Sequence, residues 1–296
     1  MGSRLAQTGG EISCVADVKS ILGEGPVWVT QESALYWVDI NGRRIFRRDK
    51  TGSVHCWASP MKIGSLAPRS RGGFIAGTDQ GIAFVDFQLD RFDVFTNPDE
   101  ALPDNRFNDG KVDRQGRFWA GTMDNREREA SGTLYRVDAD LTCTPIDEGY
   151  RVTNGPAFSP DGRIMYHNDS ARQVTYAFDL DDAGCAANRR EFLRFGKGDG
   201  YPDGMTVDAE GCLWIAFWDG WCVRRFSPDA EPIRTIELPV QRPTSCAFGG
   251  DELETLYITS ARRDLQGTEL DRQPFAGGLF AADVGVAGIA EVPFAG

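Results

Sequence analysis

Oxygen-bearing side chains recur along this chain in one local format. Glu24 stands in LGEGP (residues 22–26), where a carboxylate lies between two glycines at the start of an apolar segment. A charge buried there is costly unless a partner neutralises it. Asn154 in TNGP (153–156) and Asp203 in PDG (202–204) repeat the format. If the fold brings these three side chains together, they form an all-oxygen set that suits one divalent cation.

The elements that must position these side chains are short strands. Alternating apolar stretches separated by Gly, Asp, Asn and Pro recur along the chain, and no segment has a sustained helical period. This pattern predicts an almost entirely β structure. Turns of one design precede several strands, as in VDRQGRFW (112–119), FSPDGR (158–163) and VDAEGCLW (207–214). In each, glycine supplies the turn dihedral before the next strand.

The apolar residue that opens each turn sets the phase of a repeat. Stepping back four positions from it gives six equivalent sites, at intervals of 40, 44, 46, 49 and 41 residues: Glu24, Gly64, Asn108, Asn154, Asp203 and Thr244. Each interval fits one four-stranded blade. The spacing predicts an all-β, six-bladed β-propeller with four-stranded blades around a central channel.

A propeller has to close its ring without leaving exposed strand edges. We expect an N-terminal strand at residues 14–18 to complete the last blade, whose final strand is GLFAA (278–282). A single domain over residues 14–290 follows, with residues 1–13 a disordered N-terminal extension. Residues 261–277 are expected to form an irregular loop in the last blade.

The six equivalent sites are expected to form a ring, since the starts of inner strands face the channel at one level. Glu24, Asn154 and Asp203 supply hard oxygen donors, and Asn108 is a fourth polar member. The candidate ions are Ca²⁺, Fe²⁺, Mn²⁺, Mg²⁺ and Zn²⁺, and the all-oxygen set favours the first four over zinc. Three protein ligands leave coordination positions open, as a catalytic metal requires.

The alternative interpretation is local. Asn and Asp before glycine often cap turns and strand ends, with no ligand involved. Glu24 argues against that reading, because glutamate is a poor turn former and nothing in its own segment explains it.

Five motifs in order carry a resemblance to a known family: LGEGP (22–26), RFNDGKVD (106–113), WAGTM (119–123), TNGP (153–156) and YPDG (201–204). Together they resemble the regucalcin (senescence marker protein, SMP-30)/gluconolactonase family, in its bacterial sugar lactonase branch. The similarity extends over residues 14–285. It implies a six-bladed propeller with one divalent metal in the channel that hydrolyses sugar lactones.

The resemblance also implies roles for individual residues. It makes Glu24, Asn154 and Asp203 the metal ligands, and it places Arg106 and Asn108 on the substrate. In this family an acidic residue shortly after the Gly-Thr-Met motif can contact the sugar, and Arg126 and Glu127 are the candidates for that position here. As a carboxylate at the edge of the metal, Asp203 is the expected general base or water-orienting group.

These features predict a lactonase, a carboxylic ester hydrolase that opens aldonolactones of the gluconolactone, xylonolactone or arabinonolactone type in sugar catabolism. One alternative is a metal-dependent hydrolase of other lactones or of organophosphates, since an open metal also serves phosphoryl oxygens. Another is a non-catalytic propeller, acting as a binding scaffold or calcium-binding protein. A Ser-His-Asp hydrolase is disfavoured, because the chain has 2 histidines and no G-x-S-x-G elbow.

Composition narrows the partners. The net charge of −12 argues against nucleic acid and anionic membranes, which need a basic face. No apolar run approaches the roughly 18 residues of a membrane span, and no secretory signal is visible, so a cytoplasmic protein is expected. The 7 cysteines include no CxxC pair and are expected to be reduced thiols. The expected partner is a small-molecule sugar lactone, and the expected state is a monomer or weak oligomer.

Several other side chains have a structural and a functional interpretation. His167 in YHND (166–169) is expected to be a buried, hydrogen-bonded histidine, and Asp169 is a candidate for orienting a ligand from behind. Tyr201, Trp218, Trp221 and Phe107 either stack on a sugar face or pack between blades.

Overall fold

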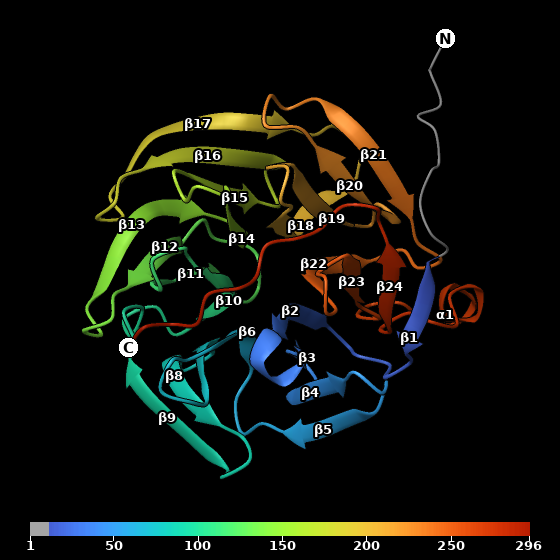
Figure 1. Ribbon diagram of the computed structural model, residues 1–296, viewed down its shortest axis with the longest axis horizontal. Helices are drawn as coiled ribbons and strands as arrows, with labels where there is room; N and C mark the ends of the chain where they lie inside the picture. Colours follow the sequence, from blue (N-terminus) through green and yellow to red (C-terminus); the bar gives the residue numbers. More distant parts are fainter. Residues whose placement is uncertain (1–11) are drawn as a thin grey trace.

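The computed structural model describes residues 12–296 and arranges them in six four-stranded antiparallel sheets around a central axis (Figure 1). This is the six-bladed propeller that the repeat predicts. Residues 1–11 of the predicted N-terminal extension lie outside the described residues. No helix in the described part of the chain has the length and apolar character to cross a membrane.

Five blades run in chain order from the channel outward. Blade 1 comprises β2 (Gly23–Val29), β3 (Ala34–Asp39), β4 (Arg44–Asp49) and β5 (Val54–Ala58). Blade 2 comprises β6 (Ile63–Pro68), β7 (Phe74–Thr78), β8 (Gly81–Asp86) and β9 (Arg91–Thr96). Blade 3 comprises β10 (Asn105–Val112), β11 (Phe118–Asp124), β12 (Gly132–Val137) and β13 (Cys143–Tyr150). Blade 4 comprises β14 (Thr153–Phe158), β15 (Ile164–Asp169), β16 (Val174–Leu180) and β17 (Ala186–Arg194). Blade 5 comprises β18 (Tyr201–Val207), β19 (Leu213–Trp218), β20 (Cys222–Phe226) and β21 (Pro232–Glu237).

Blade 6 is built from both ends of the described chain. From the channel outward it comprises β22 (Pro243–Gly249), β23 (Thr255–Ser260), β24 (Leu279–Asp283) and β1 (Ser13–Ala16). Ser13 pairs with Ala281 and Cys14 with Phe280. The predicted closure of the ring by an N-terminal strand is therefore confirmed.

Two short helices interrupt the sheets. A 3-10 turn, η1 (Thr30–Glu32), joins the first two strands of blade 1. Residues 261–277 are not loop throughout, as the sequence suggested, because they contain the helix α1 (Thr268–Arg272). At 5 residues α1 is too short to produce a helical period in the sequence.

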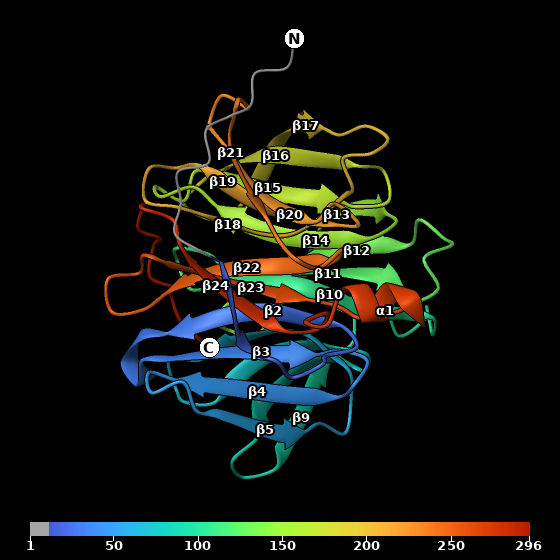
Figure 2. The ribbon, with the colours of Figure 1, turned by 90° about the vertical axis from the view of Figure 1, so that its right-hand side faces the viewer.

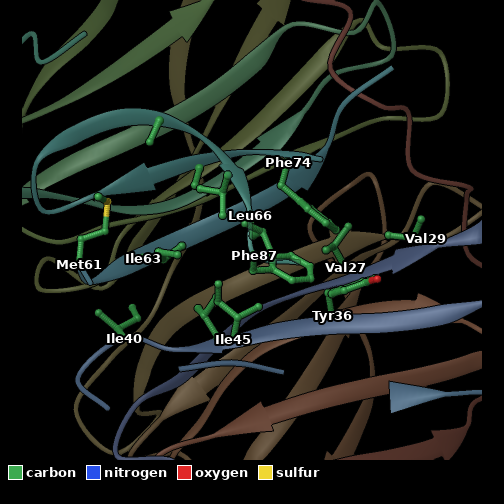
Figure 3. Close-up of a cluster of buried hydrophobic side chains, with 14 of the residues drawn as sticks. Val27, Val29, Tyr36, Ile40, Ile45, Met61, Ile63, Leu66, Phe74 and Phe87 are labelled. Carbon is green, nitrogen blue, oxygen red and sulfur yellow. The ribbon is translucent and has the colours of Figure 1, made fainter. Parts of the chain in front are cut away.

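Alternating apolar side chains fill the spaces between neighbouring blades. Between blades 1 and 2, Val27 and Tyr36 face Phe74 and Phe87 in one buried cluster (Figure 3). The rings of Tyr36 and Phe74 are 4.9 Å apart and tilted, a geometry that adds to the energy of burial. This packing holds adjacent inner strands in fixed relation around the channel.

Each inner strand carries a bulge beside its ring position. The pairing register shifts between Glu24 and Val27 in β2, with equivalent shifts in β6, β10, β14, β18 and β22. A bulge bends the strand and redirects a side chain. The glycine after Glu24 has φ 53°, and the one after Asn154 has φ 83°, which favours glycine at both places.

The two ends of the channel differ. Residues 287–296 run across the turns that follow the inner strands (Figure 1): Ala209 N donates to Ala287 O in blade 5, and Ala295 N donates to Gly116 O in blade 3. Phe294 on this segment is completely buried. Figure 2 shows α1 at the opposite face of the ring. The ring residues lie toward that opposite face, at the starts of the inner strands.

Candidate active site and metal centre

A cavity of about 520 Å³ lies at the end of the channel where the inner strands begin. Four of the six ring positions line it: Glu24, Asn108, Asn154 and Asp203. The other two positions, Gly64 and Thr244, contact the backbone of neighbouring inner strands. A Cβ at Gly64 would lie 2.3 Å from the carbonyl oxygen of Asn108, and Thr244 Oγ1 donates to Gly23 O at 2.5 Å. The repeat phase therefore brings together the three expected metal ligands and Asn108.

Glu24 and Asp203 are buried without a cation beside them. Glu24 Oε2 accepts the N–H of Gly25 at 3.1 Å, and among residues 12–296 neither carboxylate has an ion-pair partner within 4 Å. Burial raises the pKa of Glu24 well above its ordinary value, and the nearby carboxylate of Asp109 raises it further. Burial and the charge of Glu24 raise the pKa of Asp203 in the same way. A cation between the two carboxylates would offset their repulsion and favour the ionised form of both.

The amide of Asn154 is oriented by its neighbours. Its Nδ2 donates to Ser170 Oγ at 2.8 Å, and Ser170 Oγ donates to the carbonyl oxygen of Pro202 at 2.6 Å. Asn154 Oδ1 accepts from Asn108 Nδ2 at 3.1 Å and keeps a further lone pair. Ser170, which the sequence interpretation missed, thus presents the oxygen of Asn154 rather than its nitrogen to the cavity.

This donor set fits a hard divalent cation. No cluster of three His, Cys, Asp or Glu suited to a metal occurs in residues 12–296, and the third oxygen beside the two carboxylates is that of the Asn154 amide. Glu24 and Asp203 supply two negative charges and Asn154 a neutral oxygen, which together match the preferences of Ca²⁺, Mg²⁺ or Mn²⁺.

Arg106 and Asn108 form one hydrogen-bonded unit beside this set. Arg106 Nη1 donates to Asn108 Oδ1 at 2.7 Å, and Arg106 Nε donates to Asn125 Oδ1 at 3.0 Å. Both N–H bonds of the Asn108 amide are used, by Thr153 O and Asn154 Oδ1. Burial lowers the pKa of Arg106 to about 10, so the guanidinium remains charged at neutral pH.

The structure separates the two candidates in the loop after β11. Glu127 lines the cavity, where its Oε1 accepts from Arg263 Nη1 at 3.1 Å. Arg126 lies outside it, in an exposed ion pair with Asp104 at 3.1 Å. Asp124 fixes the loop by accepting backbone N–H groups from residues 126, 128 and 129. Of the two candidates, only Glu127 is placed to reach a ligand in the cavity.

Two buried aspartates, which end the second strands of their blades, hold the segments ahead of Glu24 and Asn154. Asp39 accepts the backbone N–H groups of residues 21 and 22, each at 3.0 Å. Asp169 accepts those of residues 151 and 152, at 3.2 and 3.4 Å. Asp169 therefore does not bond to the side chain of Asn154. It fixes the backbone two residues ahead of Asn154 instead.

His167 is buried as the sequence predicts, but among the described residues it lacks the predicted hydrogen bond. It is buried, but within the described part of the chain neither ring nitrogen has a hydrogen-bond partner, and its ring lies edge-on to Tyr150 at 4.7 Å. Burial lowers its pKa to about 3, so the imidazole is neutral. It does not line the cavity. The expected hydrogen bond is therefore absent among residues 12–296, and the contact with Tyr150 is an aromatic one.

The four aromatic candidates divide between the cavity and the core. Tyr201 and Trp218 line the cavity, whereas Trp221 does not. Phe107 packs against Tyr135, with ring centroids 5.9 Å apart. Tyr201 and Trp218 are therefore the two aromatic side chains able to meet a ring-shaped ligand there.

Comparison with known proteins shows the family of this chain. The model of the SMP-30/Gluconolactonase/LRE-like region matches residues 22–262. The chain belongs to this family. It is 41% identical over 287 residues to 6-deoxy-6-sulfogluconolactonase of Pseudomonas putida, covering 96% of this chain and 99% of that one. It is 36% identical to regucalcin of Xenopus laevis, covering 97% and 99%.

The family's fold is also that of this chain. A solved structure described as a calcium-binding protein, regucalcin, from Agrobacterium tumefaciens superimposes with a TM-score of 0.92 at 26% identity, covering 96% of this chain and 97% of that one. The resemblance inferred from five motifs is thus confirmed at the level of family and fold. Lactonase names among the relatives support a lactonase, and the calcium-binding description supports a divalent metal in the family.

Proposed function

We propose that this protein is a metal-dependent lactonase that hydrolyses sugar aldonolactones to aldonic acids. The observation that carries the proposal is the pair of buried carboxylates, Glu24 and Asp203, which face one cavity with the oxygen of Asn154 and form no ion pair within 4 Å among residues 12–296. The charged Arg106 lies in the same cavity. This combination suits an ester carbonyl that becomes negatively charged as water adds.

A divalent cation held by Glu24, Asn154 and Asp203 supplies Lewis acidity to the lactone carbonyl when bound. Asp203 accepts a proton from the attacking water as the new C–O bond forms at the carbonyl carbon. When the ring C–O bond breaks, the same proton passes to the departing ring oxygen, which becomes a hydroxyl. The product is one open-chain aldonic acid, which carries the new carboxyl group and the new hydroxyl.

The remaining residues position the sugar. Arg106, held by Asn125 and Asn108, donates to the carbonyl oxygen or to a neighbouring hydroxyl. Since both N–H bonds of Asn108 are already used, its Oδ1 can only accept, and it receives a sugar hydroxyl through its second lone pair. Glu127 accepts from a hydroxyl at the mouth, and Tyr201 and Trp218 contact the sugar face.

The test is acid release from freshly prepared glucono-, xylono- and arabinonolactones. The protein is stripped of metal with a chelator and reconstituted with Ca²⁺, Mg²⁺, Mn²⁺, Fe²⁺ or Zn²⁺ in turn. We expect metal-dependent acceleration over spontaneous hydrolysis for at least one lactone. The absence of any such acceleration would overturn the proposal.

Variants separate the role of Asp203 from a general effect of charge. Asp203→Ala should lose activity, whereas Asp199→Asn should keep it, because Asp199 is outside the cavity and pairs with Arg224 at 3.0 Å. If Asp203→Ala binds metal and still hydrolyses lactones, Asp203 is not the base.

The chemistry of the lactone's substituents is a separate question. The relative in Pseudomonas putida is named for a lactone with a sulfonate group, and the name regucalcin specifies no sugar. The side chains around the mouth of the cavity bear on this point.

A further inference from the structure

Four arginines line the cavity, although the chain as a whole has a net charge of −12. They come from separate segments: Arg106 from β10, Arg151 from the β13–β14 connection, Arg242 from the residue before β22, and Arg263 from the loop after β23. Four carboxylates, Glu24, Glu127, Asp203 and Asp264, line the same cavity, so the charge that it offers to a ligand depends on which of these groups are paired.

Two of these arginines already have carboxylate partners. Arg242 Nε pairs with Asp219 at 2.7 Å, and Arg263 pairs with Glu127 at 3.1 Å and with Asp264 at 3.3 Å. Within residues 12–296, the other two form no ion pair within 4 Å. The charges of Glu24 and Asp203 are not available to them once a divalent cation is bound. Two positive charges, on Arg106 and Arg151, therefore remain without an anion.

Arg151 is the one of these two that lies at the mouth. Its backbone N–H is held by Asp169, and it precedes Asn154 by three residues, so its position relative to the expected metal ligand is set by the fold. Its exposed side chain has one hydrogen bond, from Nη2 to the carbonyl oxygen of Arg128 at 3.2 Å. The other N–H groups of the guanidinium are free to bind two oxygens of an anion.

The ion pair of Arg263 crosses the mouth of the cavity. Arg263 belongs to blade 6 and Glu127 to blade 3, which face each other across the ring (Figure 1). Their side chains are 32% and 42% exposed. An ion pair this exposed contributes little stability, so an incoming anion can replace Glu127 on Arg263 at small cost.

We propose that the substrate is an aldonolactone with an anionic group remote from its carbonyl, a sulfonate, phosphate or carboxylate, which Arg151 and Arg263 bind at the mouth of the cavity. The proposal rests on the lactonase function above: Arg106 and the metal-facing side chains take the lactone ring, and the two outer arginines take the charged end. Arg151 is then the residue that determines specificity, because it has no carboxylate to exchange.

The experiment compares gluconolactone with lactones that share its ring and carry a sulfonate, phosphate or carboxylate at carbon 6. For the metal-loaded protein we expect kcat/KM to be at least tenfold higher for one of the anionic lactones. Arg151→Gln should lower kcat/KM for that lactone at least tenfold, mainly through KM, and change the value for gluconolactone less than twofold. The three anionic lactones distinguish among the sources of the charge.

The matched control is Arg126→Gln, which removes the same charge from the nearby loop outside the cavity. It should change neither substrate's kcat/KM by more than twofold. Arg151→Lys should restore part of the activity on the anionic lactone, since a lysine keeps the charge but not the two-pronged geometry. Higher salt should weaken the preference, because it screens exposed charges.

Two results overturn the proposal and leave the lactonase function intact: equal kcat/KM for neutral and anionic lactones, or an Arg151→Gln variant with an unchanged ratio. Calorimetry provides a readout that needs no turnover. The open-chain aldonic acid with the same anionic group should bind at least tenfold more weakly to Arg151→Gln than to the parent protein. Equal binding would exclude the role of Arg151 even if no lactone were hydrolysed.

Discussion

Two regions of this propeller bury carboxylates in opposite ways. In the turns after the inner strands, Asp208 accepts the backbone N–H groups of Glu210 and Cys212, Trp214 Nε1 at 2.8 Å and Arg225 Nε at 2.8 Å. Asp113 repeats this pattern in blade 3, where it accepts from residues 115, 117 and 119. Each of these carboxylates is satisfied by its own blade.

In the channel the same functional group is left without such partners. Glu24 accepts one backbone N–H. Besides burial, the charge of another carboxylate, that of Asp109, raises the pKa of Glu24. The difference teaches how to distinguish buried charges in this fold. A carboxylate that its own blade surrounds with donors stabilises the structure, whereas one that faces other carboxylates across the channel is placed for a ligand from outside the chain.

The largest expected effect comes from Glu24→Gln, which removes one channel charge with little change of shape. We expect metal content to fall and kcat/KM to drop by about 100-fold or more, since the loss of even an outer partner of a metal ligand costs about 10–100-fold. Thermal stability in chelator should not decrease, because one of two repelling charges is gone. Metal analysis, kinetics and thermal unfolding measure these effects. The control is Glu237→Gln, at an exposed position on strand β21. If Glu24→Gln kept its full metal content, Glu24 would not be placed for a ligand and the contrast with the turn carboxylates would fail.

The converse is expected of Asp208→Asn. This change weakens the hydrogen bonds from Trp214 and Arg225 to a completely buried group, so the free energy of unfolding should fall by about 2–4 kcal/mol. Urea denaturation measures the loss. The folded fraction should keep its metal and its kcat, and a selective loss of either would show that the turn carboxylates also serve the channel.

A third prediction concerns pH and the metal-free protein. Burial raises the pKa of Asp109 to about 6, and those of Glu24 and Asp203 are also raised. The unfolded chain has these pKa values near 4, so between about pH 4 and 6 the folded state holds more protons than the unfolded state. Stability in chelator should therefore fall as pH rises through this window, by up to about 1.4 kcal/mol per pH unit for each proton.

Urea midpoints at pH 5, 6 and 7, in chelator and in saturating Ca²⁺, measure this effect. The difference between the parent protein and Glu24→Gln isolates the channel groups from other carboxylates. Calcium should flatten the decline, because a cation favours the ionised forms. A parent protein that gains stability relative to Glu24→Gln as the pH rises in chelator would contradict the assignment.

The smallest effect is expected from Arg44→Gln. Arg44 pairs with the buried Asp39 at 2.8 Å, but its side chain is 34% exposed and Asp39 retains three backbone N–H donors. The free energy of unfolding should fall by no more than about 1 kcal/mol. Metal content and kcat should not change. A loss above about 2 kcal/mol, measured by urea denaturation, would show that the ion pair rather than the backbone donors satisfies Asp39.

The ring of candidate ligands was predictable because it depends on local sequence. The bulge beside each ring residue and the turn that follows its strand recur with the period of a blade, and a glycine follows Glu24, Asn154 and Asp203. A repeat of this kind carries its own register, and the ring position of Glu24, Asn154 and Asp203 follows from it. The all-β class, the number of blades and the closure by an N-terminal strand are determined at the same level.

Other parts of the site depend on the path of loops and on contacts between distant segments. The carboxylate of Asp124 accepts backbone N–H groups of the loop that follows it. The resulting path of the loop brings Glu127 into the cavity and leaves Arg126 outside, although the two are neighbours in the chain. Likewise, neither ring nitrogen of the buried His167 has the expected hydrogen-bond partner within residues 12–296.

By itself, then, the sequence determined the family, the propeller and the ring of channel residues that we propose as metal ligands, because each depends on short local motifs. Only the tertiary structure decided which charges remain unmatched. Arg263 meets Glu127 from the opposite blade, and Arg151 has no carboxylate partner in the described part of the chain. Whether a charge has a partner depends on distances between segments far apart in the chain, which no local pattern records.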